Sequence, residues 1–221
     1  MPAAASAPVS TPIAGVEHWA KKGDVDLFLF EKHAGVPGNK PVVLFVHGSS
    51  MSSQATFDMK MAGRPYASAM DYFVGKGFDA WCVDMEGYGR SGKTRDVNCD
   101  IMNGVDDLVA ATDYMAKARG IRNIMLYGNS VGAIRAALFT HRCPERVARL
   151  ALDAFVWTGE GSPTLGERKK KLPEFLTVNR RPINRAFLHS VFERDRYECA
   201  EKAVIDARYA APGGDPHSGN Q

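Results

Sequence analysis

The stretch that decides the fold runs from residue 123 to residue 141 and reads NIMLYGNSVGAIRAALFTH. Its apolar start is typical of a buried strand, and the residues from Ala133 to His141 favour a helix. Between the two lies a G-x-S-x-G pentapeptide, Gly128 to Gly132. Such a strand-to-helix turn exposes the serine oxygen, while its glycines let the two backbones approach each other. Ser130 is therefore the predicted nucleophile. The structural alternative is a glycine-rich turn in which Ser130 only caps the helix.

Working outward, the region from Val42 to Asp153 alternates short apolar runs with segments of helical period. This pattern predicts an α/β fold, a mostly parallel sheet wound with helices. Buried strands are expected at residues 42–46, 78–83, 123–127 and 149–152, and a hairpin at residues 16–20 and 25–30 adds an antiparallel edge. Helices are expected from Pro65 to Gly75 or Gly77, from about Val105 to Gly120, and from Ser130 to His141.

After Asp153 the pattern changes, and we interpret the following segment as a helical cap after the sixth strand. Short helices are expected at residues 167–176, 182–194 and 195–209. The basic run from Arg168 to Lys171 lacks the interleaved glycines and aromatics of RNA-binding modules and is interpreted as a solvated helical face. The predicted organisation is a disordered tail over 1–15, an incomplete core over 16–157, a cap over 158–209 and a flexible tail over 210–221.

Two other loops directly follow predicted strands. The sequence His47-Gly48-Ser49-Ser50 comes after the strand ending at Val46, where the elbow motif draws its second oxyanion donor. The backbone amides of Ser49 and Val131 are therefore the expected oxyanion hole. His47 is a conceivable general base, but its place before a turn glycine favours a role in ordering its own loop. Residues 84–91, DMEGYGRS, have no nucleotide-binding spacing and are expected to form a structural loop.

In this order and spacing, the three loops resemble those of the α/β-hydrolase family. The resemblance covers residues 16–153 well and the segment to Tyr209 loosely. It implies a serine hydrolase that forms an acyl-enzyme on Ser130 and acts on a small-molecule ester, lactone, amide or related acyl substrate without a cofactor. An acyltransferase on the same scaffold and a non-catalytic, ligand-binding pseudo-hydrolase are the alternatives.

The sequence departs from this family after Leu152, where no further apolar strand follows. The family places its acid and then its histidine on loops after later strands. Asp153 is the acid in a plausible place, and the downstream histidines, His189 and His217, are both more typical of surface positions. We therefore expect the base to come from outside this chain, on missing strands, a second chain or a homo-oligomer.

Composition excludes several other classes of protein. The chain has 221 residues, 45% of them hydrophobic, and a formal charge of +3. It has no apolar run long enough for a membrane span, so we expect neither a membrane nor a nucleic-acid partner. Its start has no basic leader or apolar core of a secretory signal. The four cysteines are widely spaced, which argues against a metal site and for free thiols in the cytoplasm.

Overall fold

The computed structural model describes residues 11–64, 67–155, 158–180, 183–184 and 187. Within them, six strands form one sheet in the order β1-β2-β4-β3-β5-β6. The strands are β1 (Ile13–Lys22), β2 (Val25–Ala34), β3 (Val42–Val46), β4 (Asp79–Val83), β5 (Ile124–Asn129) and β6 (Val147–Asp153). The last four pair in parallel, whereas β1 and β2 form an antiparallel hairpin at one edge. The predicted α/β fold with a mostly parallel sheet is confirmed.

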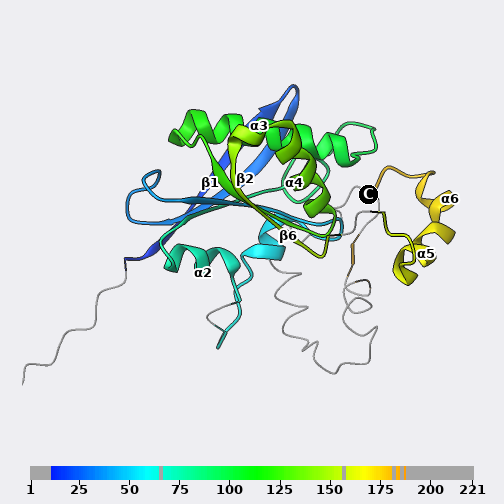
Figure 1. Cartoon of the computed structure of the whole chain (residues 1–221), viewed down its shortest axis with the longest axis horizontal. Helices are drawn as coiled ribbons and strands as arrows, with labels where there is room; N and C mark the ends of the chain where they lie inside the picture. Colours follow the sequence, from blue (N-terminus) through cyan, green and yellow to red (C-terminus); the bar gives the residue numbers. More distant parts are fainter. Residues whose placement is uncertain (1–10, 65–66, 156–157, 181–182, 185–186, 188–221) are drawn as a thin grey trace, which may run out of the picture.

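Helices cover both faces of the sheet (Figure 1). They are α1 (Ser53–Phe57), α2 (Ala69–Gly75), α3 (Ile101–Arg119) and α4 (Val131–Arg142), and a short 3₁₀ turn spans Pro144–Arg146. Alternate residues of β3 pack on opposite sides, because successive side chains of a strand point to opposite faces. Leu44 belongs to the core beneath α3 and α4, and Phe45 to the core beneath α1 and α2. The sheet is therefore buried on both faces, as its apolar strands predicted.

The ends of α3 follow the charge and capping signals of the sequence. The side chain of Asp100 accepts a hydrogen bond from the Asn103 amide at 2.8 Å, and Gly120 ends the helix at φ 70°. Lys117 and Arg119 lie in the last turn, where cations interact favourably with the helix dipole. The predicted stop at Gly120 is confirmed.

Three boundaries differ from the predictions. Strand β1 begins at Ile13, because its pairing with β2 extends from Lys22↔Val25 to Ile13↔Ala34, so the expected tail over residues 1–15 is too long. Helix α2 begins at Ala69 and not at Pro65, since the Ser68 hydroxyl caps it by accepting from the Asp71 amide. The short helix α1 was not predicted, because five residues are too few to show a helical period.

Strand β6 lies at the other edge of the described sheet and is more exposed than the central strands. It begins at Val147, two residues before the predicted start. Leu150 and Leu152 are 39% and 38% exposed. Among the described residues β6 has a strand neighbour on one side only, namely β5.

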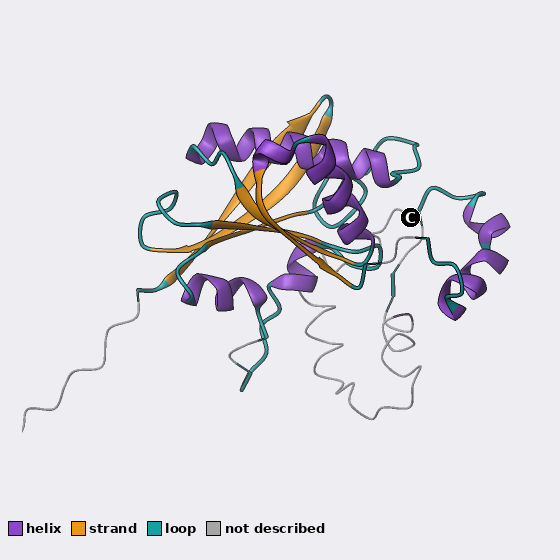
Figure 2. Cartoon of the chain, viewed as in Figure 1, coloured by secondary structure: helices purple, strands orange, loops and turns teal. Residues whose placement is uncertain are grey.

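The segment after β6 contains two short helices, α5 (Pro163–Lys170) and α6 (Leu172–Phe175), drawn in purple beyond the sheet in Figure 2. The single helix expected at 167–176 is therefore wrong. Pro173 cannot donate a backbone hydrogen bond to the preceding turn, which is why one helix does not run through the segment. The helices expected at 182–194 and 195–209 lie almost wholly outside the described residues, as does the tail over 210–221. No helix in the described part of the chain is long and apolar enough to cross a membrane.

Candidate active site

The candidate site lies where the four parallel strands end. In open α/β sheets, ligands bind at the carboxyl ends of the strands. Here β3 leads into His47, β4 into Asp84, β5 into Ser130, and β6 ends at Asp153. All the motifs singled out in the sequence therefore meet at one edge of the sheet.

Ser130 occupies a strained turn between β5 and α4. Its backbone has φ 56° and ψ −121°, an uncommon conformation for a residue other than glycine. The side chain is half-buried, and Ser130 is the first residue before the helix. This is the geometry that the strand-turn-helix pattern predicted.

Two glycines make the turn possible. A Cβ atom on Gly128 would lie 2.5 Å from the oxygen of Gly132, and one on Gly132 would lie 2.3 Å from the oxygen of Val46. Neither position has room for a side chain, so α4 lies directly against β5 and β3. The expected close approach of the backbones is confirmed.

The loop after β3 lies beside the nucleophile. A Cβ atom on Gly48 would be 3.1 Å from the Cβ atom of Ser130. Ser49 follows Gly48 directly, and Val131 is the first residue of α4. Both predicted amide donors thus belong to the junction around Ser130.

His47 is locked into this loop by both ring nitrogens. Its Nε2 accepts a hydrogen bond from the Met85 amide at 3.0 Å, so the proton resides on Nδ1, which donates to the Gly48 oxygen at 2.7 Å. The imidazole is fully buried, and this burial lowers its pKa to about 3. His47 is therefore a neutral structural residue that ties the loop after β3 to the loop after β4, as predicted.

The loop over residues 84–91 has the expected structural role. The buried carboxylate of Asp84 accepts hydrogen bonds from the amide and hydroxyl of Ser53, at 2.8 and 2.6 Å, and from the Arg90 amide at 2.9 Å. Burial raises the pKa of Asp84. The Ser91 hydroxyl donates to the Asp84 backbone oxygen at 2.6 Å and accepts from the Phe28 amide at 2.9 Å. These bonds fix the loop against β2 and α1.

Asp153 contacts the nucleophile turn through its backbone and β5 through its side chain. Its carbonyl oxygen accepts a hydrogen bond from the Ser130 amide at 2.9 Å. Its Oδ2 accepts from the Tyr127 hydroxyl at 2.8 Å and from Asn129 Nδ2 at 2.7 Å. These bonds, that from Tyr127 first, lower the pKa of Asp153, while burial and the same contact raise the pKa of Tyr127 to about 12.

Sequence reasoning missed Tyr127 and Asn129 as partners of Asp153. A signal was present, because residues two apart on a strand share one face of the sheet. In the register of β5 and β6, Asn129 lies opposite Asp153. Strand pairing combined with this alternation would have found both donors.

The other described histidines are engaged or distant. His18 is hydrogen-bonded to Glu31 and Tyr114, and His33 to the oxygen of Gly35. His141 lies near the far end of α4, ~16 Å from Ser130 at 1.5 Å per residue. The two histidines predicted as possible bases, His189 and His217, lie outside the described residues.

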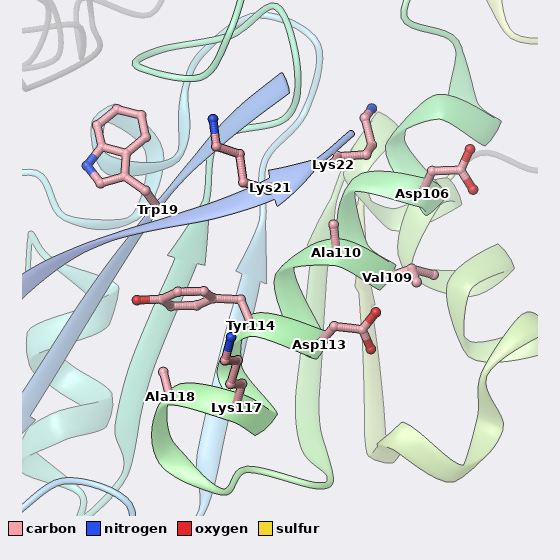
Figure 3. A pocket seen from close by; sticks show the side chains of 10 residues that line it. All are labelled: Trp19, Lys21, Lys22, Asp106, Val109, Ala110, Asp113, Tyr114, Lys117 and Ala118. Atoms are coloured by element: carbon pink, nitrogen blue, oxygen red, sulfur yellow. The ribbon is translucent and has the colours of Figure 1, made fainter. Parts of the chain in front are cut away.

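A separate hollow of about 800 Å³ lies between β1 and α3 (Figure 3). Trp19, Tyr114 and Lys117 are among its lining residues. None of the lining residues comes from the loops after β3, β4, β5 or β6, so this hollow is distinct from the site at Ser130. Among the described residues, no group of three or more His, Cys, Asp or Glu side chains is placed to hold a metal ion.

Comparison with known proteins places the chain in a family. The family described as serine aminopeptidase, S33, matches residues 37–197, which is more than half of the chain. The chain belongs to this α/β-hydrolase family. No curated protein matches it.

Solved structures with the α/β-hydrolase fold superpose on the chain at low sequence identity. A bacterial membrane phospholipase A has TM-score 0.61 at 22% identity, covering 88% of this chain and 56% of that one. The thioesterase domain from the curacin biosynthetic pathway has TM-score 0.58 at 18% identity, covering 88% and 64%. A predicted CIB-like hydrolase from Thermoplasma acidophilum has TM-score 0.50 at 20% identity, covering 63% and 62%. The chain thus spans about three fifths of the length of these structures, and the likeness shows the fold.

Proposed function

We propose that the chain is a serine hydrolase that cleaves a small-molecule carboxylic ester, lactone, amide or related acyl bond through an acyl-enzyme on Ser130. The observation that carries the proposal is the strained conformation of Ser130 between two glycines that admit no side chain. Backbone strain of this kind persists where the surrounding structure enforces it, and it is concentrated at functional sites. A serine that merely capped a helix would need no such conformation.

In the proposed reaction, the Ser130 oxygen attacks the substrate carbonyl carbon while its proton passes to a base. The carbonyl oxygen becomes an oxyanion, stabilised by the amides of Ser49 and Val131 and by the positive end of the α4 dipole. Collapse of this intermediate expels the alcohol or amine, which takes up the proton from the base. Water then attacks the acyl-enzyme in the same way and releases the acid, and Ser130 regains its proton.

We assign the acid to Asp153 and expect the base to be a histidine. The hydrogen bonds from Tyr127 and Asn129 favour the ionised form of Asp153, which is the form that orients and stabilises an imidazolium. His189, His217 or a histidine of a second chain would supply the base. In this proposal, the segment around α5 and α6 forms part of a cap near the substrate.

The pseudo-hydrolase remains a second candidate because of one observation. In the described structure, two donors from β5, and no imidazole, hold the carboxylate of Asp153. A serine without a base is a weak nucleophile. Such a protein would bind an acyl compound without cleaving it.

We also propose that the protein works in the reducing cytoplasm. The thiols of Cys82 and Cys143 lie in different parts of the fold, and both are free and buried. Buried unpaired thiols are the usual state of cysteine in that compartment.

Covalent labelling of the full chain with a fluorophosphonate tests the proposal. We expect one adduct, located on Ser130 by mass spectrometry and absent from Ser130→Ala. Ser162→Ala is the matched control, because Ser162 also precedes a helix but caps it with its side chain. Saturable ligand binding with no adduct would support the pseudo-hydrolase, and product analysis with an added alcohol or amine would reveal an acyltransferase.

A further inference from the structure

The segment from Pro163 to Arg180, which we call the α5–α6 segment, exposes both basic and apolar side chains. Its four consecutive cations, Arg168 to Lys171, are all exposed. Directly after them, Leu172, Leu176 and Val178 are 50%, 73% and 49% exposed. A solvated helical face, which the sequence favoured for the basic run, does not account for these apolar neighbours.

The excess positive charge of the protein is concentrated in this segment. Residues 163–180 contain five Arg or Lys and two Glu, a net charge of +3 that equals the formal charge of the whole chain. One of the two acids, Glu167, is paired with Lys170 at 2.6 Å. The exposed side chains of Arg168, Lys169 and Lys171 are available to an anionic surface.

The end of the segment is attached to the loop after β4. Asn179 Nδ2 donates to Asp96 Oδ1 at 2.6 Å, and Arg180 donates to the backbone oxygen of Arg95 at 3.2 Å. Ile183, a few residues on, is 5% exposed. Figure 1 shows α5 and α6 outside the two helix layers that cover the sheet. The basic and apolar side chains therefore lie outside the sheet and its covering helices. They belong to a segment whose last residues are hydrogen-bonded to the loop after β4.

We propose that the α5–α6 segment docks the protein on a membrane surface rich in anionic phospholipid. Apolar side chains next to a cluster of Lys and Arg are the features of segments that lie in the bilayer interface. The cations would interact with the lipid phosphates and carboxylates, and the two leucines and Val178 would enter the headgroup region. This peripheral contact is an alternative to the sequence-based expectation of no membrane partner.

The charge pattern disfavours the other possible occupants of this surface. A second copy of the chain would bring a like-charged segment against this one, and like charges repel. Closure over the active site would bury the leucines but would offer no anionic surface to Arg168, Lys169 and Lys171. A nucleic acid would pair with the cations but leave Leu176 in water.

Vesicle co-sedimentation of the full chain tests the proposal. We expect binding to vesicles of phosphatidylcholine and phosphatidylserine mixed at about 7:3, weaker binding in high salt, and little binding to phosphatidylcholine alone. The double variant Lys169→Glu/Lys170→Glu should lower the partition coefficient by about 25-fold or more, since each basic residue contributes about fivefold. Leu172→Ser/Leu176→Ser should also weaken binding.

Two matched controls keep the result specific to this segment. Lys60→Glu/Lys117→Glu reverses the same number of exposed lysines elsewhere, and Val36→Ser removes an apolar side chain as exposed as Leu176. Both controls should change binding less than threefold. Equal binding to neutral and anionic vesicles, no binding, or equal effects of test and control variants would overturn the proposal. Loss of a dimer in the leucine variant, seen by light scattering, would identify a second copy instead. The assay measures binding alone, so its outcome does not depend on the serine mechanism.

Discussion

The backbone oxygen of Asp153 accepts a hydrogen bond from the Ser130 amide, which ties the end of β6 to the nucleophile turn. The side chain of Asp153 takes no part in this bond. Substitution of the Asp153 side chain therefore leaves this backbone hydrogen bond in place. The contribution of the carboxylate to catalysis can thus be measured without removing the bond that holds the nucleophile turn.

Asp153→Asn removes the negative charge of the side chain and keeps the backbone bond. If the carboxylate orients the catalytic histidine, we expect turnover per folded molecule to fall by a factor on the order of 10⁴. Steady-state kinetics with a fluorogenic ester, together with thermal melting, measure both effects. A variant that loses stability but keeps most of its rate would show that Asp153 only anchors β6.

Tyr127→Phe should raise the pKa of the Asp153 carboxyl toward its ordinary value. The hydroxyl of Tyr127 donates a hydrogen bond that stabilises the ionised form of Asp153, and the variant removes this bond. An NMR titration of the side-chain carboxyl carbon of Asp153 measures the shift. The same carboxyl pKa in the variant and in the wild-type protein would contradict the role of Tyr127 in holding this carboxylate ionised.

His47 should make the protein sensitive to acid. Its folded-state pKa of about 3 lies below the usual 6.5, so only the unfolded chain takes up this proton between these values. As the pH falls from 6.5 toward 3, this group alone should lower the free energy of unfolding by about 1.4 kcal/mol per pH unit. Urea titrations at a series of pH values measure the slope.

His47→Gln keeps an acceptor for the Met85 amide but removes the ionisable group, so it should reduce that slope. The exposed His141 at the end of α4 offers the control His141→Gln, which makes the same substitution but leaves the buried His47 and its hydrogen bonds in place. If the two variants gave the same slope, the burial argument for His47 would fail.

Gly132→Ala should destabilise the fold and displace Ser130. The added methyl group would meet the backbone oxygens of Val46 and His47, which cannot move like a flexible side chain. We expect a loss of about 1–3 kcal/mol in the free energy of unfolding, measured by urea denaturation. Gly166→Ala in α5 meets nothing within 4 Å and should be neutral or stabilising by up to about 1 kcal/mol. Similar stabilities of the two variants would refute the close approach.

Ser49→Pro tests the second oxyanion donor. Proline has no backbone N–H, so turnover should fall ~10²- to 10³-fold, whereas Ser49→Ala keeps the amide and should slow the reaction only modestly. An α-hydroxy acid at position 49 removes the same N–H without the proline ring, in case the proline variant fails to fold. Native turnover in both would reject the assignment.

Much of the fold could be predicted because its determinants are local. Short stretches of sequence predict the apolar strands 42–46 and 123–127 and the end of the helix at Gly120. The structure confirms these bounds within a residue or two. The turn at Ser130 could also be predicted from the sequence, because its two glycines lie in the same pentapeptide as the serine.

The element boundaries and hydrogen bonds that the sequence did not predict depend on residues that are distant from one another in the chain. The start of α2 is set by the Ser68 hydroxyl, and the length of β1 by its pairing with β2. The donors to Asp153 come from a neighbouring strand 24 and 26 positions away in the chain. Such contacts depend on register, which no single segment of sequence specifies.

The exposed edge of β6 has a practical consequence for work with this chain. In the described part of the chain, the side of β6 that faces away from β5 has no strand partner, so its backbone groups and the apolar surface of Leu150 and Leu152 are open to another chain in an extended conformation. Such edges are templates for aggregation. We expect the purified protein to aggregate increasingly as its concentration is raised. Leu150→Lys should reduce this aggregation, because a charged side chain at a strand edge opposes pairing with another chain.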